Sequence, residues 1–131
     1  MTPFVNLALV PEAASSWLLP ARIGHVRAYA MFALGQPLDA AAALACGLAN
    51  AVVPAAELRG RARQAAEALT KQPAGSLSYT KALMRDMERI AAQMSRESAL
   101  FRERLQTAEA REAFAAFAER RKPDFSKLTA G

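Results

Sequence analysis

The sequence predicts a mainly helical fold with at most one short strand. After Asp39, at least four segments place apolar residues at the spacing of a helix face. Only residues 48–53 have the features of a strand, because β-branched Val52 and Val53 stand directly before Pro54. The 131 residues are enough for one domain with a hydrophobic core.

The first third of the chain predicts two short helices after an irregular start. Residues 1–11 are expected to be extended or irregular. A helix is expected over 15–23, because the hydroxyl of a serine such as Ser15 accepts bonds from the first free N–H groups. Pro20 should interrupt or kink that helix. A compact apolar helix should follow over 26–34.

The next helix boundaries are marked by two glycines and an aspartate. Gly35 is a suitable residue to end the helix over 26–34, because glycine adopts the left-handed conformation that often follows a helix. Asp39 is expected to cap a short helix over 40–46, which Gly47 should end.

The second half of the chain predicts three longer helices. The first should span 55–71, before a break at residues 73–75. The second should run from about Ser76, and its apolar residues recur in steps of three, four or seven at Leu83, Met87, Ile90, Met94, Phe101 and Leu105. Thr107 should cap a final helix, with apolar residues at Ala113, Phe114 and Phe117, and Pro123 should end it.

Composition limits the classes of partner. The net charge of +5 could suit nucleic acid, a membrane surface or a phosphate-bearing ligand. The arginines are interleaved with glutamates, however, and the one dense basic cluster is 120–122. No apolar run approaches the roughly 20 residues that span a bilayer. The sequence therefore predicts a cytoplasmic protein without a nucleic-acid or membrane partner and without a metal site.

The single cysteine is expected to be structural. Cys46 has no partner for a disulfide within the chain, and it stands in an alanine- and leucine-rich stretch. A small core residue in a reducing compartment is the favoured interpretation.

Glu12 is the leading candidate for catalysis. It is the one carboxylate in an apolar, small-residue segment, directly before the expected helix start. Burial in such surroundings would raise the pKa of a carboxyl group, as a general acid/base at neutral pH requires. From the residues alone, a glutamate stabilised by the helix dipole explains the position better.

A family resemblance favours the catalytic role of Glu12 over the helix-dipole role. The segments TPFVNLALVPEAASS and LLPARIGHVRAYAMFALGQPLDAAAALACGLANAVVP resemble the second half of the crotonase (enoyl-CoA hydratase/isomerase) superfamily. The fold implied is the C-terminal half of an α/β crotonase. The pattern P-E-x-x-S-S at residues 11–16 is similar to that of the Δ3,Δ2-enoyl-CoA isomerase branch, which implies Glu12 as the acid/base. Hydratases of the family have a glutamate at the position of Phe4, so the resemblance favours isomerisation over hydration.

The resemblance implies a substrate and further contacts. The substrate would be an acyl-CoA thioester, with no separate cofactor and a place in fatty acid metabolism. The tail FAERRKPDF is similar to a family segment near the acyl-CoA site, which implies substrate-binding roles for Phe117, Lys122 and Phe125, with Phe4 as a pocket wall. A frayed basic tail explains Lys122 equally well.

The resemblance also implies what this sequence lacks. Family members take both oxyanion N–H donors from loops of the first half, and no glycine-rich loop of that kind occurs in these 131 residues. We therefore expect little activity from the chain alone. A catalytically silent acyl-CoA-binding or assembly module stays open as an alternative, and a basic nucleic-acid-binding protein is supported by charge alone.

Two regions and an oligomer are expected. Residues 1–75 would be the end of the crotonase core, and 76–131 a helical oligomerisation region. The amphipathic stripe from Leu83 to Leu105 would most simply pack on its own domain. The resemblance favours burial between subunits of a homotrimer or hexamer.

Overall fold

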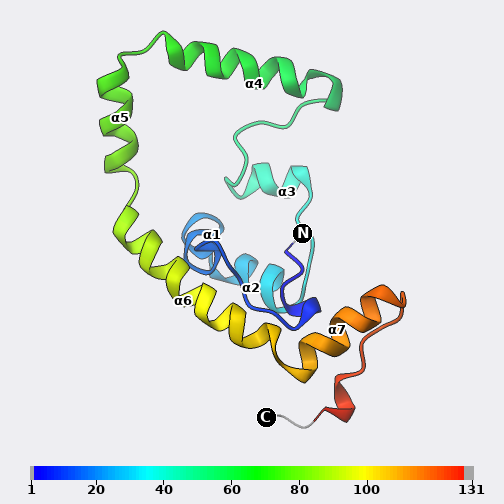
Figure 1. Cartoon of the computed structure of the whole chain (residues 1–131). Helices are drawn as coiled ribbons and strands as arrows, with labels where there is room; N and C mark the ends of the chain where they lie inside the picture. The colour runs from blue at the N-terminus through cyan, green and yellow to red at the C-terminus, as the bar shows by residue number, and fades with distance from the viewer. Residues whose placement is uncertain (1, 129–131) are drawn as a thin grey trace.

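A computed structural model describes residues 2–128 of the chain, and within them the fold is helical (Figure 1). The mainly helical prediction is therefore confirmed for the described residues. The elements in chain order are η1 (Val5–Leu7), α1 (Ser15–Ile23), α2 (His25–Ala33), α3 (Ala40–Ala45), α4 (Ala55–Thr70), α5 (Ala74–Leu83), α6 (Met87–Leu105), α7 (Ala108–Ala118) and η2 (Phe125–Lys127).

The strand predicted over 48–53 is wrong. Among residues 2–128 these positions form a bend and an irregular connection between α3 and α4, and Val52 is exposed. A strand needs a neighbouring strand to satisfy its backbone N–H and C=O groups, and the described part of the chain contains no strand. High β-propensity alone therefore does not produce a strand here.

The core lies where α1 packs against α2. Its centre is the buried set Ile23, Ala28 and Met31. Half-buried side chains cover this set, and they include the single cysteine: Leu19, Phe32, Leu38 and Cys46. Pro20 lies inside α1 without ending it, so the interruption expected there does not occur. Cys46 is confirmed as a small side chain packed on the core.

The N-terminal segment packs against the C-terminal helices α6 and α7. Residues 1–11 were expected to be irregular, but 5–7 form the short helix η1, against which α7 packs. Every third residue of α7 is buried, at Ala110, Ala113 and Ala116, so a narrow alanine face is directed inward. Arg104 of α6 adds a hydrogen bond from Nε to the carbonyl of Ala8, 3.3 Å long.

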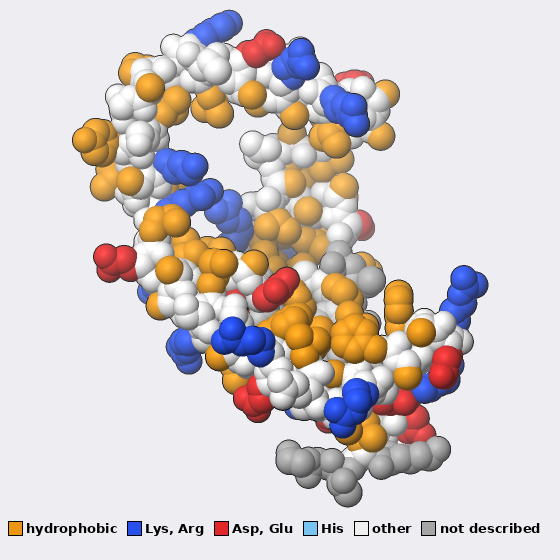
Figure 2. Space-filling model, in the orientation of Figure 1, with side chains coloured by type: hydrophobic (Ala, Val, Ile, Leu, Met, Phe, Trp, Pro, Cys, Tyr) orange, Lys and Arg blue, Asp and Glu red, His pale blue; other side chains and the backbone are white. Residues whose placement is uncertain are grey.

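Helices α4 and α5 form an arm outside this core. The chain leaves the core after α3 and returns along α6, and Figures 1 and 2 show an opening bounded by α3, α4 and α5. All residues of α4 are exposed. No helix within residues 2–128 has the length and apolar character needed to cross a membrane.

The long helix predicted from Ser76 is in fact two helices. α5 ends at Leu83, and α6 begins after Asp86, whose Oδ1 accepts the N–H of Arg89 at 2.9 Å. Leu83 therefore does not belong to the same helix as the rest of the predicted stripe. Leu83 and Met87 are 88% and 60% exposed, so the described residues leave this part of the stripe largely uncovered.

Candidate functional site

Glu12 stands on the connection between η1 and α1. Its side chain is exposed, and within the described residues its carboxylate forms no hydrogen bond or ion pair. Its backbone carbonyl accepts the N–H of Ser15 at 3.0 Å, which fixes the turn into α1. The apolar enclosure expected around Glu12 is therefore not supplied by the described residues of this chain.

The two residues after Glu12 adopt an unusual backbone. Ala13 and Ala14 have φ values of 58° and 57°, in the left-handed region. For a residue with a Cβ this conformation costs about 1–2 kcal/mol, so two in succession require compensating contacts. Neither alanine has a side chain that can form a hydrogen bond, and the contacts must come from elsewhere in the fold.

Glu97 supplies those contacts from α6. Its side chain is only 4% exposed. Its Oε2 accepts the N–H of Ala14 at 2.6 Å, and its Oε1 accepts the N–H of Ser16 at 3.1 Å and also the Ser16 hydroxyl. Hydrogen bonds to a charged group each contribute about 1.5–3 kcal/mol, which is enough to offset the left-handed backbone.

The start of α1 is thus capped by a distant carboxylate. The prediction that serine hydroxyls cap this helix is wrong, because Ser16 donates its hydroxyl to Glu97 and the buried Ser15 Oγ has no partner within residues 2–128. The N-cap residue itself is Ala14 and makes no side-chain cap. A carboxylate at a helix N-terminus also interacts favourably with the helix dipole.

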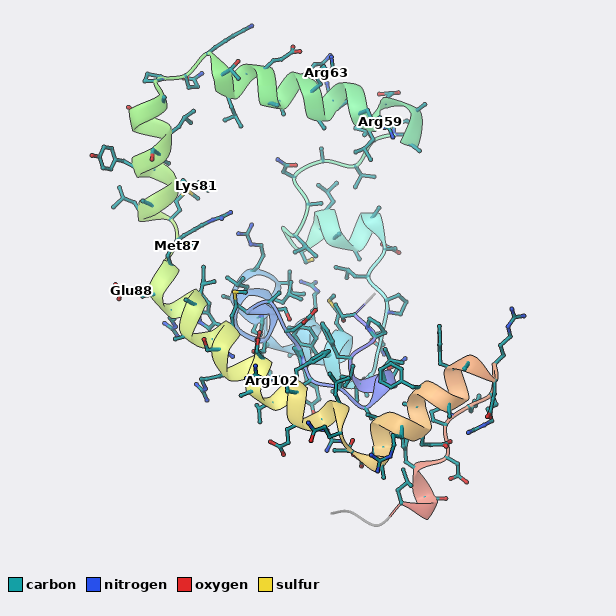
Figure 3. All side chains as sticks on the ribbon, in the orientation of Figure 1. Arg59, Arg63, Lys81, Met87, Glu88 and Arg102 are labelled. Carbon is teal, nitrogen blue, oxygen red and sulfur yellow. The ribbon has the colours of Figure 1, made fainter. Side chains whose placement is uncertain are left out.

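Three polar side chains of α6 face the start of α1. Arg89 stacks over the Trp17 ring at 4.5 Å, and Gln93 donates to the Ser16 Oγ at 2.8 Å. With Glu97 they recur every four residues, which places them on one face of the helix. Figure 3 shows the crowded side chains between α6 and α1, whereas Glu88 of α6 points away.

The prediction from sequence did not include this polar face of α6. The prediction for this helix rests on its apolar residues, which are expected to face the interior. The spacing Arg89, Gln93 and Glu97 was a usable signal, because polar residues four apart share a face as surely as apolar ones do. It could not have shown that α1 is the neighbour, since that contact joins residues more than 70 positions apart.

Phe4 and Phe125 lie around η1. The Phe4 ring is half-buried against Phe32, with ring centroids 6.1 Å apart. Phe125 of η2 borders a shallow pocket of about 280 Å³. The other side chains of that pocket come from the N-terminal segment and from the C-terminal helices: Val5, Ala8, Leu9, Arg104 and Glu109.

Phe117 and Lys122 are not drawn into the same place. Phe117 is 76% exposed on α7, and Lys122 is exposed after that helix. No hydrogen bond or ion pair among residues 2–128 joins the side chain of Lys122 to Glu12. The structure therefore brings Phe4 and Phe125 to η1, and leaves Phe117 and Lys122 free to contact something outside the described residues.

The segment that carries Phe125 is fixed by a polar cluster. Arg121 pairs with both carboxylate oxygens of Glu112, with 3.0 Å between Nη2 and Oε2, and the Asp124 N–H donates to Glu112 Oε1 at 2.9 Å. The Arg121 hydrogen bonds, followed by the Asp124 N–H, lower the pKa of Glu112 from its ordinary 4.5 to about 2. No group of three or more His, Cys, Asp or Glu side chains in the described ranges could hold a metal ion.

Comparison with known proteins supplies the family. The family model described as enoyl-CoA hydratase/isomerase matches residues 1–128. The chain belongs to the enoyl-CoA hydratase/isomerase family. The resemblance to crotonases carried by the segments at residues 2–16 and 18–54 is thereby confirmed at the level of the family.

Curated relatives are about a third identical to the chain over the aligned residues. A probable enoyl-CoA hydratase of Rhodobacter capsulatus is 30% identical over 96% of this chain and 50% of its own length. A 1,2-epoxyphenylacetyl-CoA isomerase of Escherichia coli is 32% identical over 94% of this chain and 48% of its own length. The chain thus spans about half the length of these curated relatives.

The chain also covers about half the length of similar solved structures. An enoyl-CoA hydratase/isomerase from Pseudoalteromonas atlantica superposes with a TM-score of 0.89 at 40% identity, over 94% of this chain and 50% of that one. An enoyl-CoA hydratase from Mycobacterium avium subsp. paratuberculosis gives 0.88 at 31% identity, over 95% and 52%. The helical arm and core described above are therefore half of a crotonase-type fold.

Proposed function

We propose that this chain forms part of an acyl-CoA isomerase site in which Glu12 transfers the proton. The coarse function, action on enoyl-CoA-type thioesters, follows from family membership over residues 1–128. The observation that carries the finer proposal is the exposed Glu12 carboxylate on a backbone turn fixed by buried Glu97. An acid/base must be accessible to substrate and held in one place.

The proposed chemistry is a shift of a double bond. Glu12 removes a proton from the carbon next to the thioester carbonyl, the electrons pass to the carbonyl oxygen as an enolate, and Glu12 returns the proton two carbons along. One carboxylate suffices for this reaction because the same proton leaves and returns. Phe4 stands where the resemblance implies a glutamate in hydratases, and phenylalanine cannot activate water.

The enolate needs donors that this chain is not expected to provide. A single oxyanion donor contributes about 3–4 kcal/mol to the transition state, so a carboxylate alone gives little catalysis. The resemblance places these donors in the other half of the fold. The exposure of Glu12 agrees with this expectation, since the face beside it has no cover among the described residues.

The test replaces the base without changing its size. In an enzyme that joins this chain to the missing half of the fold, Glu12→Gln should abolish isomerisation of a 3-enoyl-CoA, because the amide cannot accept the proton. Affinity for the CoA ester should be nearly unchanged. Wild-type turnover in Glu12→Gln would refute the assignment.

The 131-residue chain alone provides a second measurement. It should show little or no turnover, and robust activity would disprove the proposed need for outside oxyanion donors.

A catalytically silent module is the second candidate. The exposed Phe117 and Lys122 favour it, because a binding or assembly role needs no closed site. Acyl-CoA binding without turnover in the joined enzyme would support this alternative against the first.

A further inference from the structure

Glu97 is the buried carboxylate that the proposed mechanism does not use. It is the one charged side chain that is buried among residues 2–128. A buried carboxylate is costly unless its oxygens are hydrogen-bonded, and both oxygens of Glu97 accept bonds from the start of α1. These hydrogen bonds therefore join α6 to the segment directly after Glu12.

The contacts act on backbone rather than on side chains alone. Ala14, whose N–H donates to Oε2, is the second of the two left-handed residues that follow Glu12. Gln93 steadies the arrangement by donating to the Ser16 Oγ at 2.8 Å, and its Nε2 lies 3.5 Å from Glu97 Oε1. Without this anchor an alanine returns readily to the right-handed or extended regions.

We infer that Glu97 is a positioning residue for Glu12. By holding Ala14 and Ser16, it keeps the left-handed turn that sets the direction of the Glu12 side chain. This inference rests on the proposed role of Glu12 as the base. A purely structural tie between α6 and α1 is the competing explanation, and it predicts loss of stability without a specific effect on proton transfer.

The anchor is tested first in the chain itself, without any assumption about activity. In Glu97→Gln the side chain keeps one acceptor oxygen, and its NH2 group faces one of the two backbone N–H donors, that of Ala14 or that of Ser16. Hydrogen exchange of the Ala14 and Ser16 amides should become about 10-fold faster or more, while the Ala28 amide of α2 keeps its rate. Glu103→Gln, an exposed glutamate of the same helix, is the control and should change none of the three. Unchanged exchange at Ala14 and Ser16 would overturn the anchoring role.

The positioning role is tested by kinetics in the enzyme that joins both halves. Glu97→Gln should lower kcat by about 10-fold or more, because a displaced base loses its alignment with the substrate carbon. The KM for a 3-enoyl-CoA should change by less than about 2-fold, since Glu97 is only 4% exposed and its oxygens bind the start of α1. Ser16→Ala removes a single donor to Glu97 and should lower kcat in the same direction by a smaller factor.

The outcomes separate this inference from the proposed function. Loss of turnover in Glu12→Gln with normal kcat in both Glu97→Gln and Ser16→Ala would overturn the positioning role alone. Full turnover in Glu12→Gln would overturn the proposed function and, with it, the role of Glu97 in catalysis. If Glu97→Gln does not fold, the Ser16→Ala result decides: a lower kcat at constant KM supports the inference, and an unchanged kcat contradicts it.

Discussion

Glu112 shows how a single side chain orders the end of the chain. It lies on α7, accepts hydrogen bonds from Nη1 and Nη2 of Arg121, and also accepts one from the N–H of Asp124. These bonds connect the helix to the segment that leads to Phe125. The position of Phe125 beside η1 therefore depends on a carboxylate that remains ionised.

We predict that this cluster opens at low pH. The pKa of Glu112 is lowered to about 2 by Arg121 and the Asp124 N–H, so ionised Glu112 favours the folded arrangement. The stabilisation is complete above the ordinary value of 4.5 and is lost as the pH falls from there toward 2. A carboxyl titration by NMR should follow Glu112 over this range, and Arg121→Gln should move its midpoint upward. A midpoint near 4.5 in the unsubstituted protein would contradict the prediction.

At Gly35 the backbone conformation favours glycine. Its φ is +63°, and a Cβ there would collide with the side-chain amide of Asn6. The amide can rotate away, so the left-handed conformation is the main cost. We predict that Gly35→Ala lowers the free energy of unfolding by about 1 kcal/mol.

Gly60 provides the matched control for Gly35. It lies inside α4 with open space around its Cα, so Gly60→Ala should stabilise the protein by about 0.5–1 kcal/mol. Urea unfolding of both variants measures the difference. The same sign for the two substitutions would contradict the explanation.

Helix starts in this chain are capped in two ways. Asp39, Asp86 and Thr107 are local caps, because the side chain of each accepts a backbone N–H three residues ahead. The sequence predicts those at Asp39 and Thr107. α1 instead has Ala14 as its N-cap residue and takes its side-chain cap from Glu97, 83 positions away. Local caps can be predicted from a short window of sequence, and a distant cap cannot.

The local cap of α7 gives a prediction at this scale. The Thr107 Oγ1 accepts the N–H of Ala110 and donates to the carbonyl of Arg104. Thr107→Ala should destabilise the protein by about 1 kcal/mol. Thr70→Ala at the end of α4 is the control, because Thr70 caps no helix start, and thermal unfolding of the two variants should differ clearly. Equal loss in both would argue against a capping role.

At the scale of the whole molecule, large apolar side chains among residues 2–128 are exposed at several places. Leu83, Met84 and Met87 are exposed where α5 meets α6, and Phe117 is exposed on α7. Large apolar patches of this kind mark surfaces that another chain or segment covers. We propose that copies of the family fold associate through these residues, as the resemblance implies for a homotrimer or hexamer.

This assembly is testable by sedimentation. The chain should self-associate or bind the dye ANS, and Leu83→Glu combined with Phe117→Glu should weaken association without loss of helicity, because both side chains are exposed. Gln64→Glu is the control, since it adds a negative charge to exposed α4 without removing apolar surface. A folded, dilute monomer that binds no ANS would contradict the proposal.

The sequence by itself determined the helical class, the local caps at Asp39 and Thr107, the glycine at 35 and the family. Each of these depends on residues close together in the chain or on a motif such as P-E-x-x-S-S. The division of residues 1–75 and 76–131 into two regions and the catalytic role of Glu12 stay predictions.

Tertiary structure alone decided three other features. Residues 48–53 form no strand, because strand pairing needs a neighbouring strand and residues 2–128 contain none. The tertiary structure buried Glu97 of α6 against the start of α1 and left Glu12 exposed beside this contact. The physical reason is the same in each case: burial and hydrogen bonding depend on which distant segment lies alongside, and Glu97 meets Ala14 only when the chain has folded.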